Sequence, residues 1–197
     1  MSKIFLSLFL LSPFLFGKNI EHDFHIQNQS QLLIHGKANI INFTCLLKNA
    51  FDGTPFKLKG KKEKQIIHLK EGKITIPIKN LDCGTRGMNK EMGKILQSKE
   101  HPNIVLDFIE YSIGDWKKSG RFLASSALSK IQITLAGESI TYPIHLNLVE
   151  IDKKNYLMTG SKKLKMSDFN IKTKNYLFGL VKVNDLIEID FELFLTK

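Results

Sequence analysis

The stretch Ile187-Glu188-Ile189-Asp190-Phe191-Glu192-Leu193 places an apolar residue at every second position. Alternation of this kind is typical of a β-strand that buries one face and exposes the other. Segments with the same period occur earlier in the chain, at residues 41–47, 73–78, 131–136 and 142–148. The sequence therefore predicts an all-β protein in which each strand has one buried face.

Turn signals separate these strands and predict how they connect. They are Asp52-Gly53, Glu71-Gly72 and Gly137-Glu138. Such pairs favour tight turns, so we expect neighbouring strands to form antiparallel hairpins. Residues 50–64 are rich in Gly, Lys and Pro, and we expect them to form a long loop.

One segment has helical spacing. Met88, Met92, Ile95 and Leu96 stand at i, i+4, i+7 and i+8, which places them on one face of a helix. We expect this helix to run from about residue 88 to 98, because the Pro of His101-Pro102 disfavours helical geometry before it. Eight or so strands with one short helix suit either a sandwich or a closed barrel, and periodicity alone does not distinguish them.

Residues 1–17 have the pattern of a signal peptide. Lys3 precedes an apolar run that is shorter than the roughly 20 residues needed to span a bilayer. We predict cleavage after Gly17, although Leu15 stands where a small residue is usual and retention as an uncleaved anchor stays open. The mature chain, residues 18–197, is then one exported domain, either periplasmic or secreted.

The chain is basic, with 29 Lys and Arg against 19 Asp and Glu. The lysines cluster within residues 57–64, 162–165 and 172–174, whereas Arg occurs only as Arg86 and Arg121. Bidentate recognition of phosphate and base edges favours Arg, so we expect no nucleic-acid partner. A solvated surface explains the lysines, and weak contact with an anionic membrane surface stays open. Nothing in the charge pattern indicates an oligomeric state.

Residues that could carry catalysis or hold a metal do not form a familiar pattern. The sequence has no Gly-x-Ser-x-Gly elbow, Gly-rich phosphate loop or His-Glu-x-x-His motif. His22, Asp23 and His25 supply only part of a metal-ligand set, just after the predicted cleavage site. We therefore expect no enzymatic activity, no catalytic residue, no metal and no cofactor.

Cys45 and Cys83 are the two cysteines of the chain. An even count in an exported chain favours a disulfide, which would stabilise the fold by roughly 4 kcal/mol for a loop of about 38 residues. The alternative is a buried Cys45 beside Phe43, with a separate free thiol at Cys83.

Several segments together resemble one known family. The strongest is Met166-Ser167-Asp168-Phe169-Asn170-Ile171 with residues 183–189, Val-Asn-Asp-Leu-Ile-Glu-Ile; the others are residues 133–137 leading to Tyr142-Pro143-Ile144, and the predicted helix leading to residues 101–106. From about residue 33 to 195 their order and spacing resemble the YceI-like family of polyisoprenoid-binding, lipocalin-like proteins. Met166 stands where the family usually has Arg, and Asn170 where it usually has Gly. Cys83 lies in a Leu-Asp-Cys-Gly run that indicates a divergent branch.

The resemblance implies an eight-stranded antiparallel lipocalin-like barrel with one short helix and a long apolar channel. A polyisoprenoid or similar lipid would occupy the channel, and no catalytic residues are implied. Together with the alternation it identifies candidates for the channel wall, each of which could instead be ordinary core packing. These candidates are Phe43, Leu47, Ile76, Leu106, Phe108, Ile133, Leu135, Ile144, Leu146, Phe169, Ile189 and Phe191, with Met88 and Met92 on the helix.

Two functions fit these observations. The first is an exported carrier or store that holds a polyisoprenoid or another long apolar chain inside the barrel. The second is a structural or interaction module whose barrel is filled by side chains and whose basic surface binds an acidic partner. A continuous cavity would distinguish the first from the second. The sequence does not identify the lipid.

Overall fold

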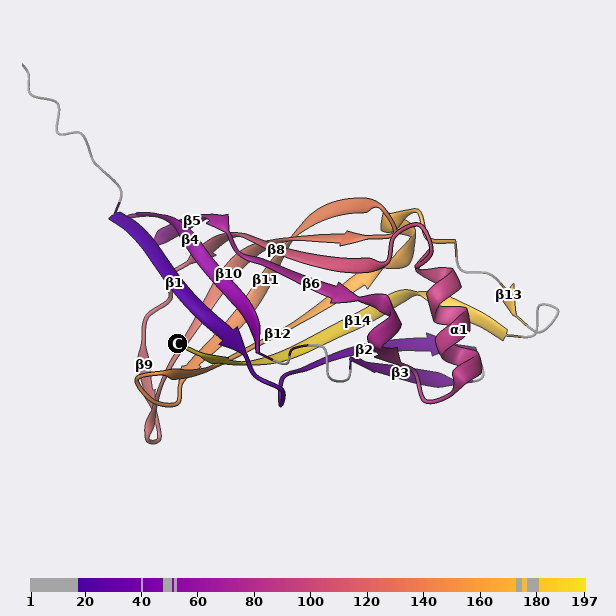
Figure 1. Ribbon diagram of the computed structural model, residues 1–197, viewed down its shortest axis with the longest axis horizontal. Helices are drawn as coiled ribbons and strands as arrows, with labels where there is room; N and C mark the ends of the chain where they lie inside the picture. The colour runs from indigo at the N-terminus through magenta and orange to yellow at the C-terminus, as the bar shows by residue number, and fades with distance from the viewer. Residues whose placement is uncertain (1–17, 40, 48–50, 52, 173–174, 177–180) are drawn as a thin grey trace, which may run out of the picture.

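The computed structural model describes residues 18–39, 41–47, 51, 53–172, 175–176 and 181–197. Within these ranges one antiparallel sheet closes into a barrel (Figure 1). Each strand of the ring pairs with the next, and the last strand pairs again with the first. The eight strands of the ring are, in order, β1 (Lys18–Ile26), β4 (Thr54–Glu63), β5 (Ile66–Glu71), β8 (Asn103–Ser112), β10 (Phe122–Leu135), β11 (Glu138–Glu150), β12 (Asn155–Lys165) and β14 (Val181–Thr196). The predicted eight-stranded barrel is confirmed.

Further strands lengthen the wall at one end of the barrel. β2 (Gln31–Ala38) pairs with β14 and with β3 (Asn42–Leu47), while β6 (Lys73–Pro77) continues the line of β5 along β8. The short strand β7 (Leu81–Asp82) pairs with β3, and β13 (Asn175–Tyr176) pairs with β14. The wall of the barrel therefore extends, at this end, beyond the eight strands that form the closed ring.

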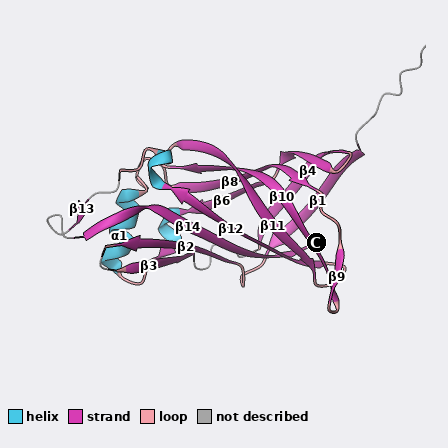
Figure 2. Cartoon of the chain, turned by 180° about the vertical axis from the view of Figure 1, so that it is seen from behind, coloured by secondary structure: helices cyan, strands magenta, loops and turns pink. Residues whose placement is uncertain are grey.

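The helical segments gather at this same end, as the view from behind shows (Figure 2). They are α1 (Arg86–Ile95) and the 3₁₀ helices η1 (Ile78–Asn80) and η2 (Met166–Phe169). We call it the helix end. The opposite end carries β9 (Lys117–Ser119), which pairs with the start of β10, and the C-terminus (Figure 1). We call that one the open end.

The predicted helix is present with shifted bounds, since α1 begins at Arg86 and stops at Ile95. Thr85 caps its start, because the Thr85 hydroxyl oxygen accepts a hydrogen bond from the Met88 N–H at 3.2 Å. The helix stops early because Gln97 adopts a left-handed backbone conformation with φ of 53°. The apolar face packs against the core of the barrel, as the spacing predicted.

The long loop expected over residues 50–64 is wrong for most of its length, because residues 54–63 form β4. This strand pairs with the whole of β1. Phe56 is buried in the barrel, whereas Lys57, Lys59 and Lys61 point to solvent. The run of lysines indicated a loop, but these lysines form the exposed, basic face of a strand.

The turn signals predicted one hairpin correctly. Ala136 and Gly137, both with positive φ, connect β10 to β11. Gly72 instead separates β5 from β6, which both pair with β8, and its carbonyl accepts the Phe108 N–H at 2.8 Å. The predicted hairpin at Asp52-Gly53 is also wrong, since β3 pairs with β2 and β4 with β1. Asp52 itself lies outside the described residues.

Of the helices in the described ranges, none is both long and apolar enough to cross a membrane. The predicted signal peptide, residues 1–17, lies outside the described residues. Its presence and its cleavage after Gly17 stay predictions.

Candidate apolar ligand site

The barrel is hollow at its open end. A cavity of about 410 Å³ lies between β1, β4, β5, β8, β11 and β12, and most of its lining is apolar. Volumes of this size are typical of sites that bind small molecules. The cavity makes the open end the candidate site.

The walls of this cavity are formed by side chains at alternate positions of the strands, in the parts of those strands that lie at the open end. On β1, Ile20, His22 and Phe24 face inward at every second position, and Ile67 and Leu69 do the same on β5. The same alternation of inward-facing positions is visible in the amino-acid sequence. Short runs interrupted by His, Lys and Glu made it weaker than the signal of the central strands.

Aromatic rings form the deep end of the cavity. Phe56 and Phe108 are almost completely buried, with ring centroids 5.4 Å apart. Phe24 packs edge-on against Tyr156 at 5.8 Å. Trp116, nearer the mouth, is 43% exposed. The cavity therefore has an apolar floor and an open, partly polar rim.

His22, Glu150 and Lys197 place an imidazole, a carboxylate and an ammonium group along the rim. Partial burial lowers the pKa of His22, and the positive charge of Lys197 lowers it further, which favours the neutral form of this imidazole. The Lys197 ammonium group lies 5.4 Å from the centre of the Tyr156 ring. A few polar groups around an apolar pocket can orient the polar end of a ligand.

The centre and the helix end of the barrel are filled. Ile26, Ile74, Ile131 and Leu193 are at most 2% exposed and line neither the large cavity nor the void at the helix end. That void measures about 30 Å³, the space of roughly one water molecule. Among the described residues, the interior thus has a cavity at the open end and a packed core beneath it.

The candidate wall residues from the sequence separate into distinct environments. Phe108 and Leu146 line the large cavity. Phe43, Met92, Ile133, Leu135 and Ile189 surround the small void beside α1. Met88 packs against the core beneath α1, and Phe191 lies over Gly160 on the neighbouring strand. The remaining candidates are buried and line neither space: Leu47, Ile76, Leu106, Ile144 and Phe169.

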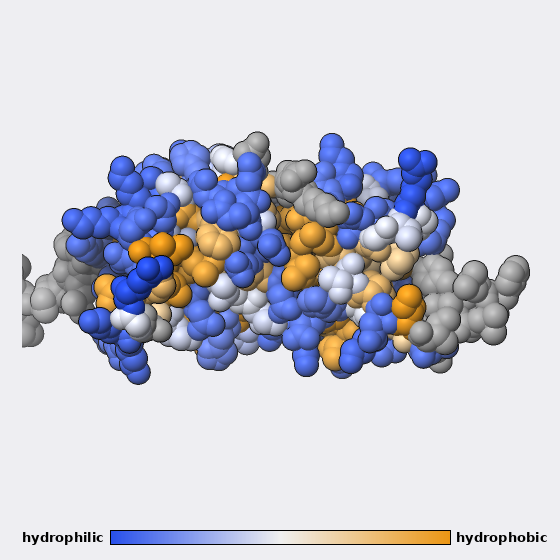
Figure 3. Space-filling view, turned by 90° about the horizontal axis from the view of Figure 1, so that it is seen from below, coloured by the Kyte–Doolittle hydropathy of each residue, from blue (hydrophilic) through white to orange (hydrophobic). Residues whose placement is uncertain are grey.

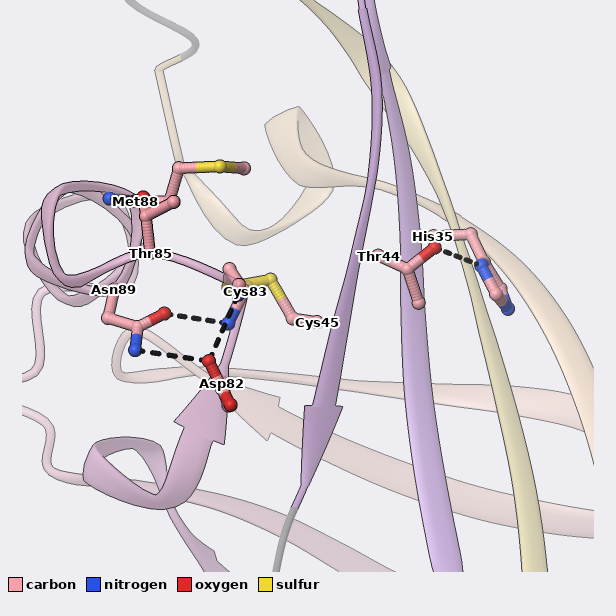
Figure 4. Close-up of a disulfide and its surroundings, with 9 residues drawn as sticks. His35, Thr44, Cys45, Asp82, Cys83, Thr85, Met88 and Asn89 are labelled. Carbon is pink, nitrogen blue, oxygen red and sulfur yellow. Dashed lines mark hydrogen bonds between the residues drawn. A yellow bond between two sulfur atoms is a disulfide. The ribbon is translucent and has the colours of Figure 1, made fainter.

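The structure joins Cys45 and Cys83 in a disulfide at the helix end (Figure 4). The predicted bond is confirmed, and the alternative of two separate thiols is wrong. Asn89 on α1 supports the same corner, since its side-chain oxygen accepts the Cys83 N–H at 2.6 Å. Its amide group donates to Asp82 at 3.4 Å. The disulfide and these bonds fix α1 to β3 and β7.

The two segments that carried the family resemblance meet in space. The Ser167 N–H and hydroxyl both donate to the Asp185 carboxylate, at 2.7 and 2.6 Å. The Tyr142 hydroxyl donates to Asp168 at 3.2 Å, and burial, reinforced by this carboxylate, raises the pKa of Tyr142 to about 12. These bonds hold η2 against β11 and β14.

Asn170 and Met166, the two residues that depart from the usual family pattern, each fit their surroundings in the structure. Asn170 has φ of 54°, a left-handed conformation that Gly adopts freely and that Asn tolerates better than most residues. Met166 is buried and lines the small void at the helix end. An apolar side chain therefore occupies this packed site, where the family usually has the charge of Arg.

The fold is a lipocalin-like β-barrel, and its open end contains an apolar cavity. The sequence profile of the YceI-like domain matches residues 38–195, so the chain belongs to the YceI-like family. No curated protein sequence matches the chain significantly.

Solved structures agree with this fold. A polyisoprenoid binding domain from Saccharophagus degradans, implicated in plant cell wall breakdown, superposes with a TM-score of 0.64 at 13% identity, over 88% of this chain and 97% of that one. BcnA of Burkholderia cenocepacia gives 0.59 at 15% identity, over 84% and 96%. The Campylobacter jejuni YceI protein gives 0.50 at 18% identity, over 66% and 73%.

Proposed function

We propose that the protein binds a polyisoprenoid or another long apolar chain in the cavity at the open end, as a carrier or store outside the cytoplasm. The observation that carries the proposal is the blind cavity of about 410 Å³ with apolar walls. The S. degradans relative, described as a polyisoprenoid binding domain, supports the choice of ligand class. The proposed role is binding, without a catalytic step.

The size of the cavity limits how much of such a chain it holds. At about 30 Å³ for a group the size of a water molecule, 410 Å³ accommodates about 14 carbon atoms. Each buried methylene contributes roughly 0.8 kcal/mol, part of which association costs offset. The tail of the ligand would lie on the aromatic floor, and its polar end would remain among His22, Glu150 and Lys197.

Two observations support a location outside the cytoplasm. Residues 1–17 have the pattern of a signal peptide. The disulfide between Cys45 and Cys83 suits an oxidising compartment, because thiols in the cytosol are generally kept reduced. The periplasm or the extracellular medium meets both conditions.

Native mass spectrometry tests the proposal. The chain is purified without detergent from an exporting host, and bound material is extracted into organic solvent and identified. We expect one lipid chain per protein. A protein that carries nothing, and takes up neither quinones nor polyprenols, would contradict the proposal and favour the interaction module.

A matched pair of variants assigns the ligand to the cavity. Leu148→Trp places a larger side chain in the cavity wall, whereas Leu128→Trp makes the same change on the outer face of β10, where Leu128 is 42% exposed. We expect the first variant to lose at least tenfold in affinity and the second to bind as the parent does. Equal binding by both variants would place the ligand elsewhere.

A further inference from the structure

We infer that the open end docks on an anionic lipid bilayer, with the mouth of the cavity facing the membrane. The inference rests on the proposed function, because it gives the lipid a route between bilayer and barrel. It assigns the contact to the β9–β10 hairpin and to the turn between β11 and β12, which surround the mouth.

These two turns lie side by side. In the β9–β10 hairpin Lys118 pairs with Leu123, and Leu123 pairs in turn with Glu150 at the end of β11. Trp116 precedes β9 and lines the cavity, as does Glu150. The hairpin and the following turn at residues 151–154 therefore form one edge of the mouth, beside the C-terminus (Figure 1).

Apolar side chains reach the surface on this edge. Trp116, Leu123 and Ile151 are each among the exposed large apolar residues. In the view from below, apolar atoms come to the surface near this end with hydrophilic side chains around them (Figure 3). Single exposed apolar residues are common. Three of them at the entrance to an apolar cavity, one a Trp, match the composition of surfaces that enter the interfacial layer of a membrane.

The charge of the same edge selects an anionic partner. Six basic side chains, Lys117, Lys118, Arg121, Lys153, Lys154 and Lys197, stand against three acidic ones, Asp115, Glu150 and Asp152. The Asp152 carboxylate accepts bonds from the Lys154 N–H and from Asn155, which leaves it less available to neighbouring cations. Arg121 lies over the Phe122 ring at 4.9 Å, so its charge is held beside an apolar group.

The helix end provides the contrast that makes the assignment specific. It also presents exposed lysines, with Ile41 and Leu186 as exposed apolar residues. Behind that end, however, the described residues enclose a void of about 30 Å³. A lipid leaving a bilayer can be accepted at the open end and not at the helix end, so the membrane contact belongs at the open end.

Trp116 is the single Trp of the chain, so its fluorescence reports directly on the mouth. The protein is titrated with vesicles of phosphatidylglycerol and phosphatidylcholine, and separately with vesicles of phosphatidylcholine alone. We expect a blue shift of Trp116 emission and co-sedimentation with the anionic vesicles only, both weakening as salt is raised.

Two charge-matched triple variants locate the contact. Lys117→Ala, Lys118→Ala and Arg121→Ala remove three charges at the open end, and Lys79→Ala, Lys90→Ala and Lys99→Ala remove three at the helix end. Each basic residue near an anionic leaflet strengthens association about fivefold. We expect the first variant to bind anionic vesicles on the order of a hundredfold more weakly, and the second to change less than about threefold at the same salt.

Several outcomes would overturn the inference: no binding to anionic vesicles, equal losses in the two variants, a larger loss at the helix end, or binding to polyglutamate but not to vesicles. Uptake of N-phenyl-1-naphthylamine from solution measures the cavity separately, and the open-end variant should retain it. Uptake without docking contradicts this inference alone. Docking without uptake contradicts the proposed function and leaves the membrane contact standing.

Discussion

The open end and the helix end share strands yet have different interiors. β8, β10, β11 and β14 run from one to the other, but the cavity at the open end measures about 410 Å³ and the void at the helix end about 30 Å³. The difference follows from what covers each end. α1, η1 and η2 add side chains to the helix end, and no helical segment lies over the open end among the described residues. One barrel can thus combine a packed half that provides stability with a hollow half that provides a site.

Removing the disulfide should give the largest effect, and only on the packed half. For a sequence separation of 38 residues, Cys45→Ser with Cys83→Ser should lower the free energy of unfolding by about 4 kcal/mol. Denaturant titration measures this loss. Affinity for an apolar probe, measured under conditions where the variant stays folded, should be unchanged, because neither cysteine lines the cavity. A parallel loss of affinity would show that the two halves are coupled.

Shortening a side chain to Ala should destabilise the protein by different amounts in the packed half and in the hollow half. Ile133→Ala in the packed half should destabilise the protein by about 3 kcal/mol, because it opens a void among buried neighbours. Leu148→Ala at the wall of the existing cavity should cost under about 1 kcal/mol, since that side chain already borders empty space. Thermal unfolding of both variants measures the difference. Equal costs would mean that the open end is filled in solution.

Ligand length should reveal the floor of the cavity. Affinity for alkyl carboxylates should rise by about 0.8 kcal/mol or less for each added methylene, until about 14 carbons fill the cavity. Longer chains should add little, because the packed centre blocks them. Competition with a fluorescent apolar probe measures the series. A steady rise to much longer chains would show that the centre opens to form a through channel.

The smallest effect should come from His22. Its pKa in the folded protein lies below the ordinary value of 6.5, so the unfolded chain binds more protons between these two values. Stability should therefore fall as the pH drops below about 6.5, until His22 is protonated in both states. His22→Gln should flatten this part of the curve of stability against pH. A variant with the parent's slope would assign the dependence to other groups.

The sequence predicted the architecture where alternation was long and uninterrupted. Residues 131–135 and 142–148 lie in β10 and β11, and residues 187–193 lie in β14; Ala136 belongs to the turn after β10. Prediction failed for β4, because its apolar positions are few and its outer face is a run of lysines that suggested a loop. Both outcomes follow from the same rule, since the period of two is reliable only when both faces of a strand contribute to it.

The candidate site was harder to predict than the fold. The strongest alternation belongs to the long central strands, and Ile144, one of the candidates that it identifies, is buried and lines neither the cavity nor the void. Part of the cavity lining comes from strands with weaker alternation, with Ile20 on β1 and Leu69 on β5. Alternation identifies which face of a strand points inward, but only packing in three dimensions determines where the interior stays empty.

The position of β14 along the chain has a consequence for biosynthesis. This strand lies between β12 and β2, contacts β1 near its end, and consists of residues 181–196. The pairing of Ile26 with Leu195 joins residues that stand 169 positions apart in the sequence (195 minus 26). A nascent chain that still lacks β14 is an open sheet with unpaired edges, and contacts of such long range form slowly. The barrel therefore closes only after β14 has been synthesised.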